Sequence, residues 1–147
     1  MTFAQEIAEY LEDQSIGTVG TTLFYGRMPD LETSTTIAVI VDHGGPPPPA
    51  SLPQRDVLLQ VMVRAATYDL ARKFAGQVHN LLHGLIAVDV GDNTVQSALA
   101  MGLPAYIGPD DNGRELVSGN YVFHTVANTA SGETSTGYEG DKDPNLN

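Results

Sequence analysis

The chain has 147 residues, and its 18 acidic and seven basic residues give it a formal net charge of −11 at pH 7. This excess of acid excludes a general binder of nucleic acid or of anionic membranes, because both need clustered lysine and arginine side chains. Charged residues make up only 17% of the chain, against about 25% in average soluble domains, which indicates a surface covered by neutral residues or by other subunits.

The first predicted element is a helix over residues 3–14. Thr2 followed by Gln5 is typical of a capping box, and apolar residues then recur at helical spacing. We expect the acidic residues of this helix on one solvated face; they are Glu6, Glu9, Glu12 and Asp13. The N-terminal sequence lacks the basic and apolar regions of a signal peptide, and no apolar run approaches the ~18 residues of a membrane span.

Two strands and a long connection follow. Residues 21–25 are β-branched and aromatic, as in a strand. The apolar run within residues 36–42 is too continuous for a strand with one wet face, so it predicts a central place in the sheet. Residues 44–53 include four consecutive prolines, which favour an extended polyproline segment. This connection is either a long hairpin loop or a docking segment for a partner, and in both cases we expect it to project.

The centre of the chain predicts a strand and then a helix. Residues 56–65 alternate between two faces, with Arg64 on the face away from the core. Thr67 or Asp69 begins a helix that carries a clear apolar stripe, and Gly84 ends it.

The last third predicts two more strands. Residues 94–107 form an interrupted strand, in which Gly102 and Pro104 mark a bulge or a bend. Residues 111–113 are a hairpin signal, and residues 115–127 form the last strand. The predicted fold is therefore α+β: a largely antiparallel sheet of about five strands with two helices packed on it, in the order α-β-β-β-α-β-β, and an extended C-terminal tail.

The acidity is uneven along the chain. Residues 1–32 carry six acids and one arginine, residues 33–105 carry five acids and four bases, and residues 106–147 carry seven acids and two bases. We expect residues 1–127 to form a single domain. Residues 128–147 are polar and bury too little apolar surface to offset their ordering entropy, so we expect a flexible tail unless a neighbouring subunit holds it.

The sequence contains no motif that indicates catalysis. It has no cysteine, no P-loop, no dinucleotide-binding glycines and no nucleophile elbow. His79 and His83 have the spacing of a two-histidine metal motif, but Asn80 stands where the glutamate base belongs and no third ligand is indicated. Residues 110–113 resemble part of a calcium loop without its distal glutamate, and a hairpin turn explains them. We expect no catalytic residue, no metal and no cofactor.

Several short stretches occur in a characteristic succession between residues 23 and 121. The residues that carry it are Gly26, Arg27, Pro29, Asp30, Gly45, Arg64, Tyr68, Leu82, Pro104, Gly108, Asp110, Gly113, Asn120 and Tyr121. In this succession the chain resembles, over residues 3–127, the tail terminator or minor capsid proteins of long-tailed bacteriophages.

The resemblance implies a non-enzymatic component of the virion, located in the head-proximal neck region of the tail and assembled in the host cytoplasm. Such proteins form a homo-oligomeric ring, typically of six subunits. The ring caps the tail tube, stops its polymerisation and joins the tail to the head-completion or neck proteins. By this resemblance the partners are further copies of the chain, the tail tube protein and the neck proteins, with no membrane.

The four-proline segment and the C-terminal tail have no counterpart in that pattern. We expect subunit or partner contacts at Pro46, Pro47, Pro48, Pro49, Arg64 and Tyr138. Acidic side chains that face a central channel would repel DNA phosphates, so DNA would pass without specific binding.

Two other interpretations stay open. The first is a head-completion or neck connector protein of the same virion, which has similar requirements. The second is a small hydrolase with an unrecognised site, since paired carboxylates always occur among 18 acidic residues.

Overall fold

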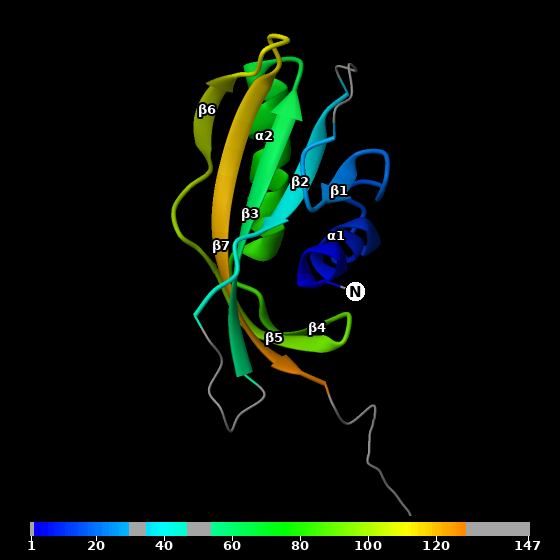
Figure 1. Ribbon diagram of the computed structural model, residues 1–147, viewed down its shortest axis with the longest axis vertical. Helices are drawn as coiled ribbons and strands as arrows, with labels where there is room; N and C mark the ends of the chain where they lie inside the picture. Colours follow the sequence, from blue (N-terminus) through cyan, green and yellow to red (C-terminus); the bar gives the residue numbers. More distant parts are fainter. Residues whose placement is uncertain (1, 30–34, 47–53, 129–147) are drawn as a thin grey trace, which may run out of the picture.

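The computed structural model describes residues 2–29, 35–46 and 54–128. These residues form an α+β fold in which two helices pack on a mixed sheet of seven strands (Figure 1). The elements in chain order are α1 (Phe3–Asp13), β1 (Leu23–Tyr25), β2 (Ile37–Asp42), β3 (Gln54–Ala65), α2 (Tyr68–Leu82), β4 (Ile86–Val90), β5 (Asn93–Ala100), β6 (Ala105–Pro109) and β7 (Glu115–Ala127).

The sheet has the order β1-β2-β3-β7-β5-β4, and β6 also pairs with β7. Strand β7 is its axis: β3 pairs with it from Gln54 opposite Val126 to Ala65 opposite Glu115. On the other side of β7, β5 pairs with its C-terminal half and β6 with its N-terminal half. Among the described residues, no strand pairs with the other edge of β6.

The prediction of five strands is wrong in number, and the sheet is not wholly antiparallel. Strand β4 was not predicted, because this edge strand is largely exposed and lacks a strict apolar alternation. The interrupted strand predicted over residues 94–107 is two strands, β5 and β6, with the bend at Gly102 and Pro104 between them. Strand β1 pairs with β2 in parallel, whereas all other pairs are antiparallel.

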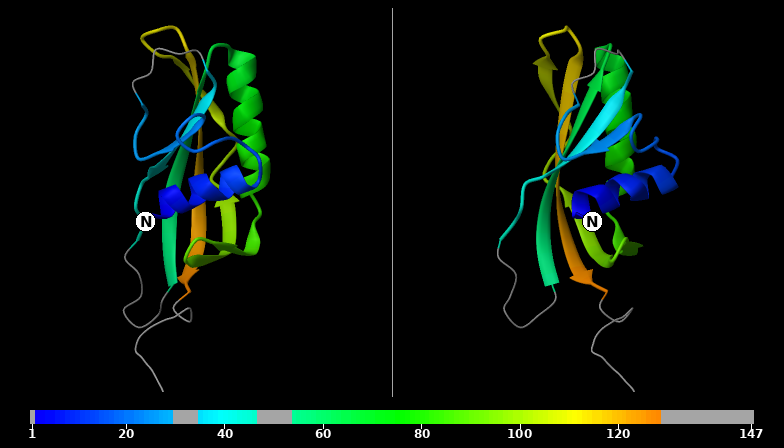
Figure 2. Two further views of the ribbon diagram at one scale, coloured as in Figure 1. Left: turned by 90° about the vertical axis from the view of Figure 1, so that its right-hand side faces the viewer. Right: turned by 45° about the vertical axis from the view of Figure 1, so that its right-hand side comes forward.

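Both helices cover the same face of the sheet. The ring of Phe3 in α1 meets that of Phe123 edge-on, with the centroids 5.3 Å apart, and the ring of His79 in α2 lies 6.1 Å from that of Tyr121. Phe123 and Tyr121 are two positions apart on β7, so they point to the same side. The two views of Figure 2 show α1 and α2 on this side, and no helix of the described residues lies on the other face of the sheet.

Helix α2 is the element that the sequence predicts best. The hydroxyl of Thr67 accepts a hydrogen bond from the backbone N–H of Leu70 at 3.2 Å, as an N-cap does. Gly84 follows the helix with a φ of +90°, which favours glycine at this position. The apolar stripe is buried against the sheet, with Phe74 and Val78 in the core.

Helix α1 differs from its prediction in two respects. The Thr2 hydroxyl accepts from the Gln5 N–H at 3.2 Å, but the Gln5 side chain donates forward to Glu9 at 3.2 Å, so the structure shows only half of the capping box. The expectation of a fully solvated acidic face is wrong for Glu6, which is only 4% exposed. Its carboxylate accepts hydrogen bonds from the backbone N–H of Asp92 at 2.9 Å and from the side-chain amide of Asn93 at 2.8 Å.

The described part of the chain ends one residue after β7. The N–H of Asn128 donates to the carbonyl of Asp92 at 2.8 Å, which ties this residue to the β4–β5 turn. The tail predicted over residues 128–147 otherwise lies outside the described residues, as do Asp30, Pro47, Pro48, Pro49 and Tyr138. Neither described helix is long and apolar enough to cross a membrane.

Candidate assembly surface

Some of the residues singled out in the sequence are structural. Leu82 and Tyr121 are fully buried in the core, and burial raises the pKa of the Tyr121 hydroxyl to about 12. Gly26 follows β1, where its N–H donates to the carbonyl of Ile40 at 3.0 Å. Asn120 is exposed on β7, and its backbone carbonyl accepts from Met101 at 2.8 Å. These residues have structural roles in the core and the sheet.

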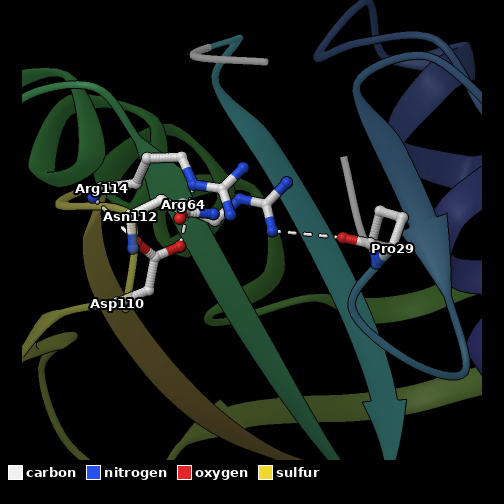
Figure 3. Close-up of polar contacts among 5 residues, drawn as sticks. All are labelled: Pro29, Arg64, Asp110, Asn112 and Arg114. Carbon is white, nitrogen blue, oxygen red and sulfur yellow. Dashed lines mark hydrogen bonds and ion pairs between the residues drawn. The ribbon is translucent and has the colours of Figure 1, made fainter. Parts of the chain in front are cut away.

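A second group lies at the end of the sheet where β3 ends and β7 begins (Figure 3). The sequence predicts Arg64 at the surface, available to an acid of this or the next subunit, but the structure buries it to 3% exposure. The reason is the connection after β1, because Nη1 of Arg64 donates to the carbonyl of Pro29 at 3.2 Å. Arg64 thus ties Pro29 to the sheet.

Arg114 and Asp110 close the hairpin between β6 and β7. Nε of Arg114 lies 2.8 Å from the Asp110 carboxylate, which also accepts from the backbone N–H groups of Asn112 and Arg114 at 2.9 and 2.8 Å. Burial acts to raise the pKa of Asp110, but these N–H donors and the guanidinium outweigh it and hold the pKa below its ordinary value. The hairpin signal of the sequence is therefore confirmed, and Gly113 supplies its left-handed residue at a φ of +76°.

An ordered cluster of aromatic side chains covers the surface between α2 and β6. The rings of Tyr68 and Tyr106 meet edge-on with their centroids 5.2 Å apart. The guanidinium of Arg72 lies 5.8 Å from the Tyr68 ring and donates to the Pro104 carbonyl at 2.8 Å. The Tyr106 hydroxyl donates to Glu115 at 2.5 Å, and this hydrogen bond raises the pKa of Tyr106. These contacts hold two partly exposed tyrosines in fixed positions.

The same edge of the molecule carries a surface that the sequence analysis missed. No charged residue occurs from Asn93 to Pro109, and large apolar side chains of this stretch are exposed: Leu99, Met101, Leu103, Tyr106 and Ile107. Leu103 is 82% exposed and Met101 is 64% exposed, at the bend between β5 and β6. The signal for this surface that the sequence carries is the uncharged run itself. Exposed apolar patches are typical of interaction sites.

A groove lies on the other side of α2, between this helix and the connection from α1 to β1. Its volume is about 440 Å³, and its apolar walls are Ile16, Leu70 and Phe74. Lys73 is the only charged residue among the described residues that line it.

The remaining positions give local structure. A side chain at Gly45 would collide with the carbonyl oxygen of Asp56, so the β2–β3 hairpin requires glycine there. Gly108 lies at the irregularity in the pairing of β6 with β7, and Arg27 is exposed after β1. Pro46 is exposed at the start of the proline segment.

The two histidines on α2 form no metal site with the residues described. Their rings stack with centroids 5.2 Å apart, and Nδ1 of His83 accepts a hydrogen bond from the backbone N–H of Ala100 at 2.9 Å. His83 therefore fastens the end of α2 to β5. Within the described ranges there is no group of three or more histidine or acidic side chains that could hold a metal ion.

Comparison with known proteins identifies a family and a similarity of fold to a solved structure. The family of bacteriophage tail terminator proteins matches residues 10–127. No curated protein matches the chain. Among solved structures, the chain is similar in fold to a chain from the virion of a native gene transfer agent (GTA) particle, with a TM-score of 0.53 and 14% identity, over 85% of this chain and 96% of that chain.

Proposed function

Because the chain belongs to the family of bacteriophage tail terminator proteins, we propose that it forms a ring that caps the head-proximal end of the tail tube. The family is one of structural phage proteins rather than of enzymes, and its members are located in the virion tail. In the proposal the ring has six subunits, stops polymerisation of the tube and joins the tail to the head-completion or neck proteins. The observation that carries it is the family match over residues 10–127.

The surface of the described residues supports an assembling protein. The stretch from Asn93 to Pro109 has no charged residue and exposes several large apolar side chains. Beside it, Arg72 lies over the ring of Tyr68, and Glu115 accepts a hydrogen bond from Tyr106. Tyrosine, arginine and large apolar residues are enriched at the centres of protein interfaces. Such a surface is costly in a monomer, and subunit contact would remove it from water.

We further propose that DNA passes the ring without specific binding. The chain has few cations, and Arg64 and Arg114 are buried in the protomer, which removes them from the surface that could meet phosphate. The net charge of −11 then leaves an acidic exterior, and acidic walls repel DNA. Residues 1–127 form the assembling domain in this proposal, and the C-terminal residues, Tyr138 among them, and the proline segment Pro46–Pro49 contact other subunits or partners.

The test is tail tube elongation in the presence of the purified protein. Tube subunits are polymerised from purified tail tips, and the protein is added at increasing concentration. We expect elongation to stop, and electron microscopy to show one ring with six-fold symmetry at the end away from the tip. An affinity label attached after Asn147 identifies the protein in the ring.

Two outcomes would contradict the proposal. Tubes that continue to grow at saturating protein would show that it is no terminator. A twelve-fold ring bound to portal complexes, with no binding to tubes, would instead identify a head-completion or neck connector.

A further inference from the structure

We propose that neighbouring subunits of the ring are joined by the β5–β6 bend of one copy, which inserts into the groove beside α2 of the next copy. The bend is the apolar knob formed by Met101 and Leu103, and the groove is the one between α2 and the α1–β1 connection. This inference rests on the proposed function, because it names the contact that would build the ring.

The knob has the properties of an inserted element. Leu103 and Met101 are more exposed than most apolar side chains of this protein, at 82% and 64%. Gly102 lies between them, and Pro104 follows with its carbonyl held by Arg72 at 2.8 Å. The N–H of Met101 donates to the carbonyl of Asn120 at 2.8 Å. The bend is therefore fastened at both ends, so little conformational entropy is lost when it is bound.

The groove has complementary properties. Ile16 and Leu70 form its apolar walls, and the buried ring of Phe74 also lines it. Its volume of about 440 Å³ accommodates more than one aliphatic side chain. Leu70 is itself partly exposed. Insertion of the knob would remove apolar surface of both copies from water.

The two surfaces lie on opposite sides of the subunit. Figure 1 shows the β5–β6 connection on the left of the sheet and the α1–β1 connection on the right. In Figure 2 (left), the α1–β1 connection faces the viewer, and β6 lies behind the sheet. A contact between two different surfaces of identical chains is heterologous, and repetition of such a contact generates a ring when the rotation closes. Symmetric pairing of two β6 edges would give only a dimer.

The distribution of charge favours a second copy of the chain as the occupant of the groove. A chain of net charge −11 repels its own copies over most of its surface. The stretch that contains the knob has no charged residue, and the described lining of the groove has one cation, Lys73, and no acid. Two copies can therefore approach through these surfaces without opposing carboxylates at the contact.

Disulfide cross-linking tests the contact directly, because the chain has no cysteine of its own. One cysteine replaces Leu103 at the knob, and a second replaces Gln77, an exposed residue that lines the groove. The double variant Leu103→Cys/Gln77→Cys is bound to purified tail tubes, oxidised and separated without reductant. We expect a ladder of covalent oligomers up to the ring size, whereas each single variant gives no ladder.

The matched control moves the first cysteine to another highly exposed apolar position. Ile86 on β4 is 74% exposed and lies outside both surfaces, so Ile86→Cys/Gln77→Cys should give no ladder. A second pair of variants needs no cysteine: Leu103→Ser should raise the concentration required for ring formation on tubes at least ~30-fold, as truncation of an interface hot spot does. Ile86→Ser should change it less than about twofold, and both should keep the thermal unfolding of the parent chain.

The outcomes separate this contact from the proposed function. Rings on the tubes without a ladder, or with Leu103→Ser as active as the parent, would overturn the knob-and-groove contact and leave the terminator function standing. A covalent dimer from Leu103→Cys alone would replace it with a symmetric contact. Failure of the parent chain to bind the tubes at all would refute the function itself.

Discussion

Replacement of Glu6 by alanine should lower the free energy of unfolding by about 2–4 kcal/mol. The carboxylate is almost fully buried and accepts from Asp92 N at 2.9 Å and from Asn93 Nδ2 at 2.8 Å. Hydrogen bonds to a charged group contribute about 1.5–3 kcal/mol each. A cavity of about 390 Å³ borders these three residues. In Glu6→Ala, water can therefore accept the hydrogen bond of the more exposed Asp92 N–H, which reduces the loss of stability.

A graded series separates the two hydrogen bonds. In Glu6→Gln the carbonyl oxygen can still accept from Asn93, but the amide NH₂ meets the N–H of Asp92, donor against donor. We therefore expect Glu6→Gln to lower the free energy of unfolding by about half as much as Glu6→Ala does. Combined with Asn93→Ala in a double-mutant cycle, Glu6→Ala should show a coupling of about 0.5–3 kcal/mol.

Urea unfolding followed by far-ultraviolet circular dichroism measures these free energies, with an unchanged m-value as the sign that only stability has changed. The control is Asp13→Ala, because Asp13 is an exposed acid at the other end of the same helix; its effect should stay within about 0.5 kcal/mol. A loss below about 1 kcal/mol for Glu6→Ala would refute the reasoning that Glu6 anchors α1 to the β4–β5 turn.

Two further predictions concern the core and the β6–β7 hairpin. Phe74→Ala should lower the free energy of unfolding by ~3–5 kcal/mol, because Phe74 belongs to the core under α2; a loss under about 1 kcal/mol in urea unfolding would contradict this packing. For Asp110, the depressed pKa means that the folded state favours the ionised carboxyl. Its contribution is present above the unfolded pKa of about 3.9 and is lost as the pH falls through the lower folded value. The difference in unfolding free energy between the parent chain and Asp110→Asn should therefore stay constant from pH 7 to about pH 5 and shrink below about pH 4. An equal difference at pH 7 and at pH 3 would contradict this role of Asp110.

The sequence determined the elements whose residues repeat at a regular spacing. Helix α2 and strand β7 agree closely with their predictions, and β2 is continuously buried from Ile37 to Ile40, as its apolar run indicates. In these elements the local period of the side chains coincides with the face that the fold buries. The family resemblance over residues 3–127 also came from short local stretches, and the family match over residues 10–127 confirms it.

Tertiary structure alone decided which polar residues are buried and which apolar residues are exposed. Glu6 has the helical position of a solvated acid, but the β4–β5 turn, more than eighty residues later, covers it. Arg64 alternates with core residues and should face outward, but it is buried and donates a hydrogen bond to the carbonyl of Pro29, which follows β1. Leu103 is an apolar residue of the kind that fills cores, yet it lies in the bend between β5 and β6 and is exposed. Periodicity reports only the neighbours within one element, whereas burial depends on segments that are distant in the chain, and the proposed assembly surface is of this second kind.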